Sequence, residues 1–422
     1  MSAPVASTAP VTTPSSQWQR RLRVRNLTLI AIVGFALLSL VRVITGAQEL
    51  TSAGTIQAAL TSSIPIAMAG LGGLWSERAG IVNIGLEGMM ILGTFGAGYF
   101  GYHYGSIAGI LGAIVLGMIG GLLHGIATVY FGVDHIVSGV AINIIALGAA
   151  GFLAETYFTG LEGGGPTQSP PLPAPMTINV DFLDNPLASI EAKQWFFVSD
   201  FAGLLRVFVN DLPVLTILCL ALFVLTFWVL WRTKFGLRLR SCGEEPAAAE
   251  SLGVNVYNYK MIAVVISGGL SGLGGAFLAM VASSGFQVGQ TGGRGYIGLA
   301  AMIFGNWRPG GLLLGSGLFG YTQALPLRRE ATVSIHALLL LVAILLLLVA
   351  AYQLWRKNTL QAVSGAVFGA AFLVWYLSTD VVPSDFTKMA PYVTTLLVLA
   401  LASQRLRMPK ADGLVYRRGS AG

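Results

Sequence analysis

Stretches of about twenty mostly apolar residues recur along this chain, and they constrain its fold more than any other feature. Only 10% of the 422 residues are charged, whereas soluble domains carry roughly 25%. The sequence therefore predicts an all-α fold, a polytopic transmembrane helical bundle with about 10–12 spans. The candidate spans are residues 27–46, 54–75, 84–102, 105–131, 135–158, 211–232, 260–284, 296–306, 309–325, 335–355, 360–378 and 386–404.

Two of these segments, 296–306 and 309–325, are short for a span. They form either two full spans or a re-entrant pair packed inside the bundle. Another segment carries stripes of small residues spaced by four. We favour static close packing of helices over a moving interface for these stripes. Their members are Ser267, Gly268, Ser271, Gly272 and Gly275.

The distribution of Lys and Arg predicts the orientation, because positive charge concentrates in short cytoplasmic loops. With the N-terminus inside and alternating spans, most of the 25 Lys and Arg fall inside and most of the 18 Asp and Glu outside. Both termini are then cytoplasmic. The inner basic segments are the N-terminal tail, Arg78, residues 232–260, Arg308, Arg356 with Lys357, and the C-terminal tail.

Polar segments divide the chain into regions. Residues 1–26 are expected to form a disordered cytoplasmic tail, because their first part is rich in Ser, Thr, Pro and Ala. Residues 27–406 form the transmembrane domain, and 407–422 form a cytoplasmic tail. A signal peptide is the alternative for the first apolar run, which is long for one and is followed by more spans. Residues 159–210 contain many prolines and predict a long, extended external loop.

The cytoplasmic loop at 233–259 contains a segment, Gly243 to Gly253, with the features of a short capped helix. Acidic residues precede Pro246, which is favoured in the first turn of a helix, and three alanines with high helix propensity follow it. A helix of about two turns is too short to be stable alone. It packs either on the protein's own bundle or into a partner protein on the cytoplasmic side.

Several motifs resemble those of known permeases. Glu245, Pro246, Ala247 and Ala248, closed by Gly253, resemble the coupling-helix loop of ABC importer permeases, whose pattern is Glu-Ala-Ala, three residues, Gly. Four other stretches are similar to the branched-chain amino acid, simple sugar and nucleoside permease superfamily, most of all to its nucleoside branch, which works with a basic membrane lipoprotein. They are SERAGIVNIGLEGMM at 76–90, FGLRLR at 235–240, GRGYIGLAAMIFG at 293–305 and GLVYRRG at 413–419.

The resemblance covers roughly residues 50–325 and 386–419. It implies a type II-like ABC importer permease fold in a bacterial plasma membrane. The apolar segments within 330–384 fall outside the resemblance and are interpreted as a two-helix insertion.

The resemblance also implies partners. A separate ATPase would dock on the coupling residues, a second related permease would complete the pore, and an external lipoprotein would deliver the solute. ATP and Mg²⁺ would bind the ATPase, because this chain has no Gly-Lys dipeptide and hence no Walker A loop. We therefore expect a transport subunit that is not an enzyme and holds no cofactor. The ATPase-coupling residues are Glu245, Ala247, Ala248, Glu250 and Gly253.

Polar residues within apolar segments are the candidates for a substrate pathway. Asn83 and Glu87 are four residues apart and would share a helix face, and Asn143 lies in the fifth span. The alternative is an inner-end turn in which Glu87 pairs with Arg78. Neutral amides suit the hydroxyls and base edges of a nucleoside.

Other functions are less consistent with the sequence. The motif Gly293-x-Gly295-x-x-Gly298 opens an apolar segment without a preceding strand, so it is no dinucleotide site. The four histidines have no metal-ligand spacing, and the positive charge forms no patch for nucleic acid. A simple-sugar or branched-chain amino acid permease remains the alternative. An ion-coupled secondary transporter is less favoured, since deep acidic residues are nearly absent.

Overall fold

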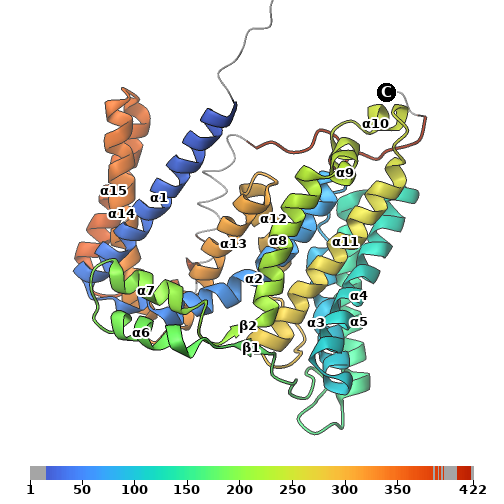
Figure 1. Ribbon diagram of the computed structural model, residues 1–422, viewed down its shortest axis with the longest axis horizontal. Helices are drawn as coiled ribbons and strands as arrows, with labels where there is room; N and C mark the ends of the chain where they lie inside the picture. Colours follow the sequence, from blue (N-terminus) through green and yellow to red (C-terminus); the bar gives the residue numbers. More distant parts are fainter. Residues whose placement is uncertain (1–15, 384, 388, 391–392, 394–405, 420–422) are drawn as a thin grey trace, which may run out of the picture.

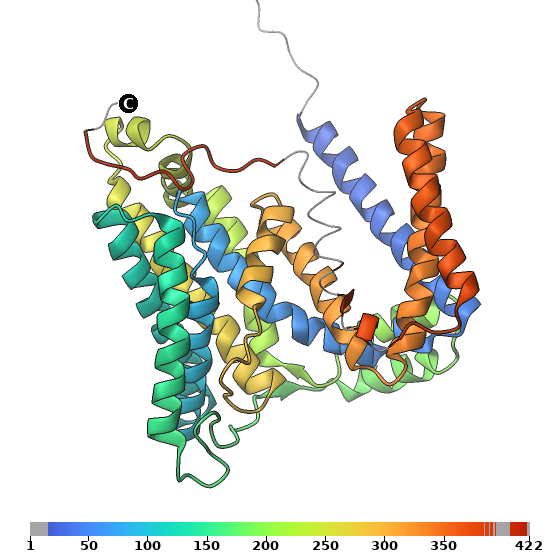
Figure 2. The same cartoon turned by 180° about the vertical axis from the view of Figure 1, so that it is seen from behind.

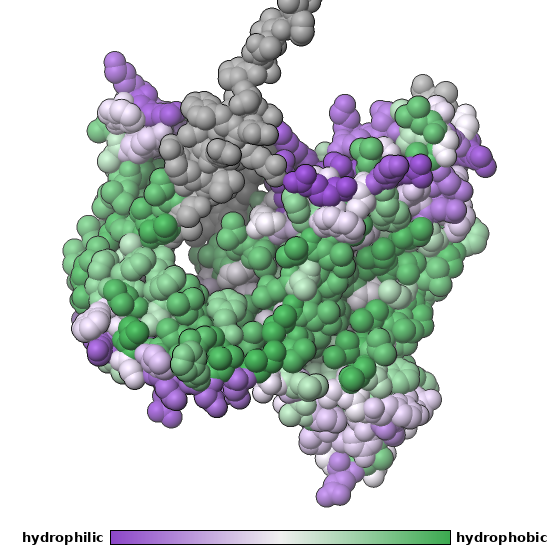
Figure 3. Space-filling view, in the orientation of Figure 1, coloured by the Kyte–Doolittle hydropathy of each residue, from purple (hydrophilic) through white to green (hydrophobic). Residues whose placement is uncertain are grey.

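The computed structural model describes residues 16–383, 385–387, 389–390, 393 and 406–419. Nearly all of the regular structure is helical (Figure 1). A broad apolar band separates two polar ends of the molecule (Figure 3). We call the end formed by Arg78, residues 234–251 and residues 406–419 the basic end. The end formed by residues 159–213 and 283–293 is called the opposite end.

The main body contains the closely packed helices of the bundle. They are α2 (Ala53–Arg78), α3 (Leu86–Tyr104), α4 (Ser106–Gly125), α5 (His135–Phe158), α8 (Val214–Arg232), α11 (Val256–Phe277), α12 (Arg294–Phe304) and α13 (Pro309–Ala324). Short π-helical turns extend α4 and α11, namely η2 (Ile126–Tyr130) and η3 (Leu278–Ala282).

The remaining elements lie at the ends or to one side (Figures 1 and 2). Helices α9 (Lys234–Glu244) and α10 (Pro246–Ser251) form part of the basic end. The opposite end holds η1 (Gln48–Leu50), β1 (Thr177–Ile178), α6 (Asp181–Glu191), α7 (Val198–Arg206), β2 (Leu212–Pro213) and η4 (Leu325–Leu327). Helices α1 (Ser16–Thr45), α14 (Ala331–Trp355) and α15 (Thr359–Ser378) stand beside the body.

Seven of the described helical segments are long and apolar enough to cross a membrane. This confirms the expected polytopic, all-α membrane fold. The total of about 10–12 spans stays a prediction, because the expected span at 386–404 lies largely outside the described residues. The seven segments are Gln48–Arg78, Ser106–Tyr130, His135–Phe158, Val214–Arg232, Val256–Ala282, Ala331–Trp355 and Thr359–Ser378.

The first helix begins earlier than expected. Residues 16–26, which were expected to be disordered, belong to α1, while residues 1–15 lie outside the described residues. The sequence has no proline or glycine from Ser16 to Val33. Nothing in this local sequence therefore separates the basic residues from the apolar run that follows them in the same helix.

Helices α2, α3, α4 and α11 approach one another closely because glycines line their contacts. A Cβ atom placed on Gly272 of α11 would lie 2.3 Å from the carbonyl oxygen of Ala113 in α4. One placed on Gly275 would lie 2.4 Å from the carbonyl oxygen of Met90 in α3. The close packing expected for the small-residue stripes is therefore present.

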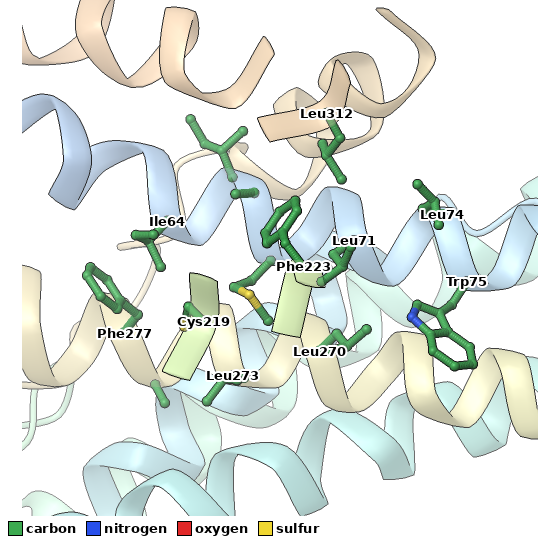
Figure 4. Close-up of a cluster of buried hydrophobic side chains, with 14 of the residues drawn as sticks. Ile64, Leu71, Leu74, Trp75, Cys219, Phe223, Leu270, Leu273, Phe277 and Leu312 are labelled. Atoms are coloured by element: carbon green, nitrogen blue, oxygen red, sulfur yellow. The ribbon is translucent and has the colours of Figure 1, made fainter. Parts of the chain in front are cut away.

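Apolar side chains from four helices fill the centre of the body (Figure 4). Helix α2 lies in the middle of this cluster, with α8 and α11 on one side of it and α13 on the other. The labelled members are Ile64, Leu71, Leu74 and Trp75 of α2, Cys219 and Phe223 of α8, Leu270, Leu273 and Phe277 of α11, and Leu312 of α13.

The two short segments form a hairpin, α12 and α13, of 11 and 16 residues. At 1.5 Å per residue they extend about 16 and 24 Å, which is less than the roughly 30 Å of a hydrocarbon layer. The turn between them reaches Arg78, whose Nη2 donates a hydrogen bond of 2.7 Å to the carbonyl oxygen of Trp307. These lengths favour the re-entrant pair over two full spans.

The segment expected to be an extended external loop is extended only in part. Within it, residues 181–191 and 198–206 form α6 and α7, so the expectation is wrong for these residues. Acidic residues in the first turn of α6 favour the helix, and Arg206 joins the two helices through Asp184 (2.7 Å) and Glu191 (3.1 Å).

Candidate functional site

The predicted docking segment folds as α9 and α10 at the basic end (Figure 1). Glu245 occupies the N-cap position of α10, and Pro246 lies in its first turn, as expected. The helix has six residues. Gly253 then adopts a φ of +81°, a left-handed conformation that favours glycine.

One face of α10 is anchored and the other is exposed. Ala249 is buried against Cys242 and Val256. Ala248 and Leu252 point outward, and 85% of Leu252 is exposed. The helix therefore lies on its own protein and leaves a second face open to contact with a partner, so it is compatible with both alternatives of the sequence analysis.

The C-terminal segment at 406–419 holds α10 in place. Glu250 accepts a hydrogen bond from the Tyr416 hydroxyl and another, of 3.0 Å, from Nε of Arg418. The bond from Tyr416 lowers the pKa of the Glu250 carboxyl. The backbone N–H of Ala411 donates to the carbonyl oxygen of Gly243 at 2.9 Å. We call α9, α10 and residues 406–419 together the platform, which is built from two parts of the chain that are far apart in sequence.

Buried charged groups connect this platform to the bundle. Glu77 accepts a hydrogen bond of 2.6 Å from the indole N–H of Trp307, at the turn of the α12–α13 hairpin. Lys260 is 1% exposed, and its Nζ donates to the carbonyl oxygen of Gly80 at 3.3 Å. Asp412 of the C-terminal segment is also buried, and burial raises the pKa of its carboxyl to about 7.

An aromatic contact fastens α9 to the same region. The guanidinium groups of Arg78 and Arg240 lie 5.5 and 5.6 Å from the ring centroid of Trp231. Arg240 also donates to the carbonyl oxygen of Leu230 at 2.9 Å. These cation–π contacts link α2, α8 and α9, so a displacement of the platform would act on α2.

The three predicted pathway residues lie in one buried polar region, which we call the network, and each of them makes hydrogen bonds to its own partners. The amide of Asn83 donates to Ser267 at 2.9 Å. Glu87 accepts from the backbone N–H groups of Gly293 (2.9 Å) and Gly295 (2.6 Å), at the start of α12. Glu87 thus stabilises the positive end of that short helix.

Asn143 completes the network from α5. It accepts from the backbone N–H of Gly88 at 2.7 Å and donates to the Tyr296 hydroxyl at 2.9 Å. Asn83 is fully buried and Asn143 is 8% exposed. In this conformation the network joins α3, α5, α11 and α12.

Two details of the expected site are wrong. Asn83 and Glu87 do not share a helix face, because α3 begins only at Leu86 and Asn83 lies in the segment before it. Gly80, with a φ of +83°, breaks the helix there. Glu87 does not pair with Arg78, which instead contacts Trp307 and lies 3.9 Å from Glu244.

The contacts of the C-terminal segment with α10 do not follow from any local pattern in the sequence. Tyr416 and Arg418 belong to the family-like motif at 413–419, and they reach Glu250, which is 166 and 168 residues away. The one sequence feature that could have indicated these contacts is GLVYRRG, a polar stretch with an aromatic residue after the last apolar segment.

The chain is similar to a known family of membrane permeases. The family model for the branched-chain amino acid transport system permease component matches residues 55–351. This range ends within α14, inside the segment interpreted as an insertion, and the insertion stays a prediction. No solved structure matches.

Curated relatives match over most of their length. The nucleoside ABC transporter permease protein NupC of Lactococcus lactis is 34% identical over 85% of this chain and 94% of its own. The guanosine ABC transporter permease protein NupQ of Bacillus subtilis is 32% identical over 86% and 96%. A putative glucose ABC transporter permease of Haloferax volcanii is 30% identical over 66% and 79%. With a family model that covers most of the transmembrane body, this chain belongs to the branched-chain amino acid transport system permease family.

Proposed function

We propose that this chain is the permease subunit of an ATP-driven importer of nucleosides. The similarity to NupC and NupQ along nearly their full length carries this proposal. The glucose permease matches a smaller part of the chain, so a sugar is a less favoured solute. The long apolar helices fit a transport pathway through a bilayer.

The ATPase docks on the exposed face of α10, around Ala248 and Leu252. This face is apolar at its tip, and hydrogen bonds from Tyr416 and Arg418 to Glu250 hold the helix from behind. ATP and Mg²⁺ bind to the ATPase subunit and not to this chain. Both termini and the basic end face the cytoplasm in this proposal, since positive charge concentrates on that side.

Movement of the ATPase reaches the bundle through the buried contacts at the basic end. A push on α10 and α9 acts on Arg78 through Trp231. Arg78 and Glu77 both hold Trp307 and thereby the α12–α13 hairpin. The network of Asn83, Glu87 and Asn143 parts as this hairpin moves, and these residues then contribute to the solute pathway.

The other partners follow from the same proposal. A substrate-binding lipoprotein delivers the solute to the opposite end, which faces outward. A second, related permease completes the pathway in a heterodimer, as the resemblance implies. The transporter resides in a bacterial plasma membrane.

The proposal is tested by copurification and uptake. Ala248→Arg should abolish copurification of the ATPase and ATP-dependent guanosine uptake, while the purified permease keeps its thermal stability. Asn358→Arg is the matched control, because Asn358 is exposed in the α14–α15 turn at a distance from α10. Normal uptake in Ala248→Arg, or uptake that survives ATP depletion, would contradict the proposal and favour an ion-coupled carrier.

A further inference from the structure

A cavity of about 620 Å³ opens at the opposite end, between the first half of α2, the start of α8, the end of η3 and the N-terminus of α12. Its volume lies in the range of roughly 300–1,000 Å³ that is typical of small-molecule sites. It is distinct from the network of Asn83, Glu87 and Asn143, none of which lines it.

One face of α2 forms the wall of this cavity. Gly54, Gln57, Ala58, Thr61 and Ser62 all line it, at the spacing of one helical face. The neighbouring positions Thr55, Ala59 and Ser63 are buried on the other side of the helix. The polar side chains therefore face the cavity as a group.

These polar groups have no partner of their own. Among the described residues, the side chains of Gln57, Thr61 and Ser62 make no hydrogen bond, although they belong to a candidate membrane span. Pro65 lies inside α2 and lacks the N–H that would engage the carbonyl oxygen of Thr61. Unpaired polar groups within a span are costly and indicate a solute or water pathway.

Three charged residues lie at the mouth of the cavity, of which Arg328 and Arg294 are engaged by other groups and Asp211 is exposed. Arg328 forms an ion pair of 2.9 Å with Glu49, and Arg294 donates to the carbonyl oxygens of Gln290 (3.1 Å) and Thr291 (3.2 Å). The wall contributed by α2 carries no charged group: its polar side chains are those of Gln57, Thr61 and Ser62, and Ala58 and Leu60 lie beside them. Such a wall suits an uncharged solute with several donors and acceptors better than an amino acid with two charges.

We propose that this cavity is the site at which the permease receives a nucleoside, with Gln57, Thr61 and Ser62 hydrogen-bonded to its hydroxyls and base edge. This assignment rests on the proposed function. The planar guanidinium groups at the mouth stack on the base as it enters.

Cysteine labelling tests the proposal directly. The two native cysteines, Cys219 and Cys242, are fully buried, so an introduced thiol reacts without background. Thr61→Cys should react with a membrane-impermeant maleimide in the assembled transporter, and guanosine should slow the reaction at least fivefold. Leucine and glucose should leave the rate unchanged. Ser63→Cys, on the buried side of α2, is the matched control and should not react.

Transport gives the second measurement. Ala58→Trp should fill the cavity and abolish guanosine uptake without loss of the ATPase from the purified complex. Gln57→Leu should raise the KM for guanosine roughly tenfold, the size expected for one lost hydrogen bond, whereas Gln361→Leu on exposed α15 should not.

The outcomes separate the two proposals. A wild-type complex that imports no nucleoside overturns the proposed function and this assignment with it. If the wild-type complex imports guanosine but guanosine gives no protection and Ala58→Trp transports normally, only the cavity assignment fails. Protection by leucine or glucose in place of guanosine overturns the nucleoside as its ligand.

Discussion

The main body and the α14–α15 pair are both helical and apolar, yet they pack in different ways. In the body, backbones meet through glycine, as at Gly272 and Ala113, where no side chain fits. In the pair the approach is looser, because a Cβ atom on Gly365 would lie 3.2 Å from that of Ala350 and 3.4 Å from the nearest backbone atom, the carbonyl oxygen of Leu346. Only 11% of the best spanning window of α15 is buried, against 78% for the windows of α2 and α11, while α14 at 39% is close to the 33% of α4, α5 and α8.

The difference shows where precision is needed. The body holds buried polar groups and the platform at the basic end, whose geometry depends on fixed distances between helices. The pair exposes most of its apolar surface, and lipid can cover a range of shapes there. Substitutions should therefore be costly at the buried helix contacts of the body and tolerated on the exposed faces of the pair.

The largest difference in stability between the body and the pair is expected for substitutions of glycine. Gly272→Val should prevent stable folding, at a cost of more than about 3 kcal/mol, because the new side chain meets the backbone of α4. Gly365→Val should cost less, since the nearest backbone atom to its Cβ lies 3.4 Å away, against 2.3 Å at Gly272. Gly148→Val in α5, where nothing lies within 4 Å, controls for the residue type. Thermal unfolding of the purified proteins measures all three, and equal losses would refute the contrast.

Removal of one charge within the body should have an intermediate effect. Glu87→Gln weakens the hydrogen bonds to Gly293 and Gly295 and should cost about 1–3 kcal/mol of unfolding free energy. Glu155→Gln is the matched control on an exposed position and should change stability by less than about 0.5 kcal/mol. The midpoints of chemical unfolding provide the comparison.

The basic end should also respond to pH. The pKa of Asp412 is raised from 3.8 to about 7, so protonation favours the docked C-terminal segment. This contribution to stability is complete below about pH 4 and is lost as pH rises through 7, by at most about 1.4 kcal/mol per pH unit. Its environment also includes Glu77, Arg78 and Lys260.

Thermal unfolding between pH 5 and 8 measures this dependence. Asp412→Asn removes the titrating group and should flatten the profile. An unchanged profile in the variant would assign the dependence to Glu77 or Lys260 instead.

The smallest effect is expected on the lipid side of the pair. Val367 of α15 is 61% exposed, so Val367→Ala should alter stability by less than about 0.5 kcal/mol. A larger loss, measured by the same thermal assay, would show that another protein covers this face.

Sequence patterns predicted the apolar helices and the caps of α10, because both depend on neighbouring residues. They did not predict that Glu87 would bind the start of α12. Gly293 and Gly295 follow Glu87 by 206 and 208 positions, and only the tertiary fold brings them together. They also placed Asn83 in a helix, although it lies between α2 and α3, in the non-helical segment that contains Gly80 and Gly85. Helices follow from local periodicity, whereas the site depends on tertiary contacts.

The bond between Glu250 and Tyr416 has a consequence for biogenesis. The residues are 166 positions apart, and Tyr416 follows every membrane-spanning segment that the structure describes. A nascent chain that has produced α10 still lacks the segment that holds it. If the ATPase docks on α10 as proposed, its docking surface is held in place only once translation has passed Tyr416.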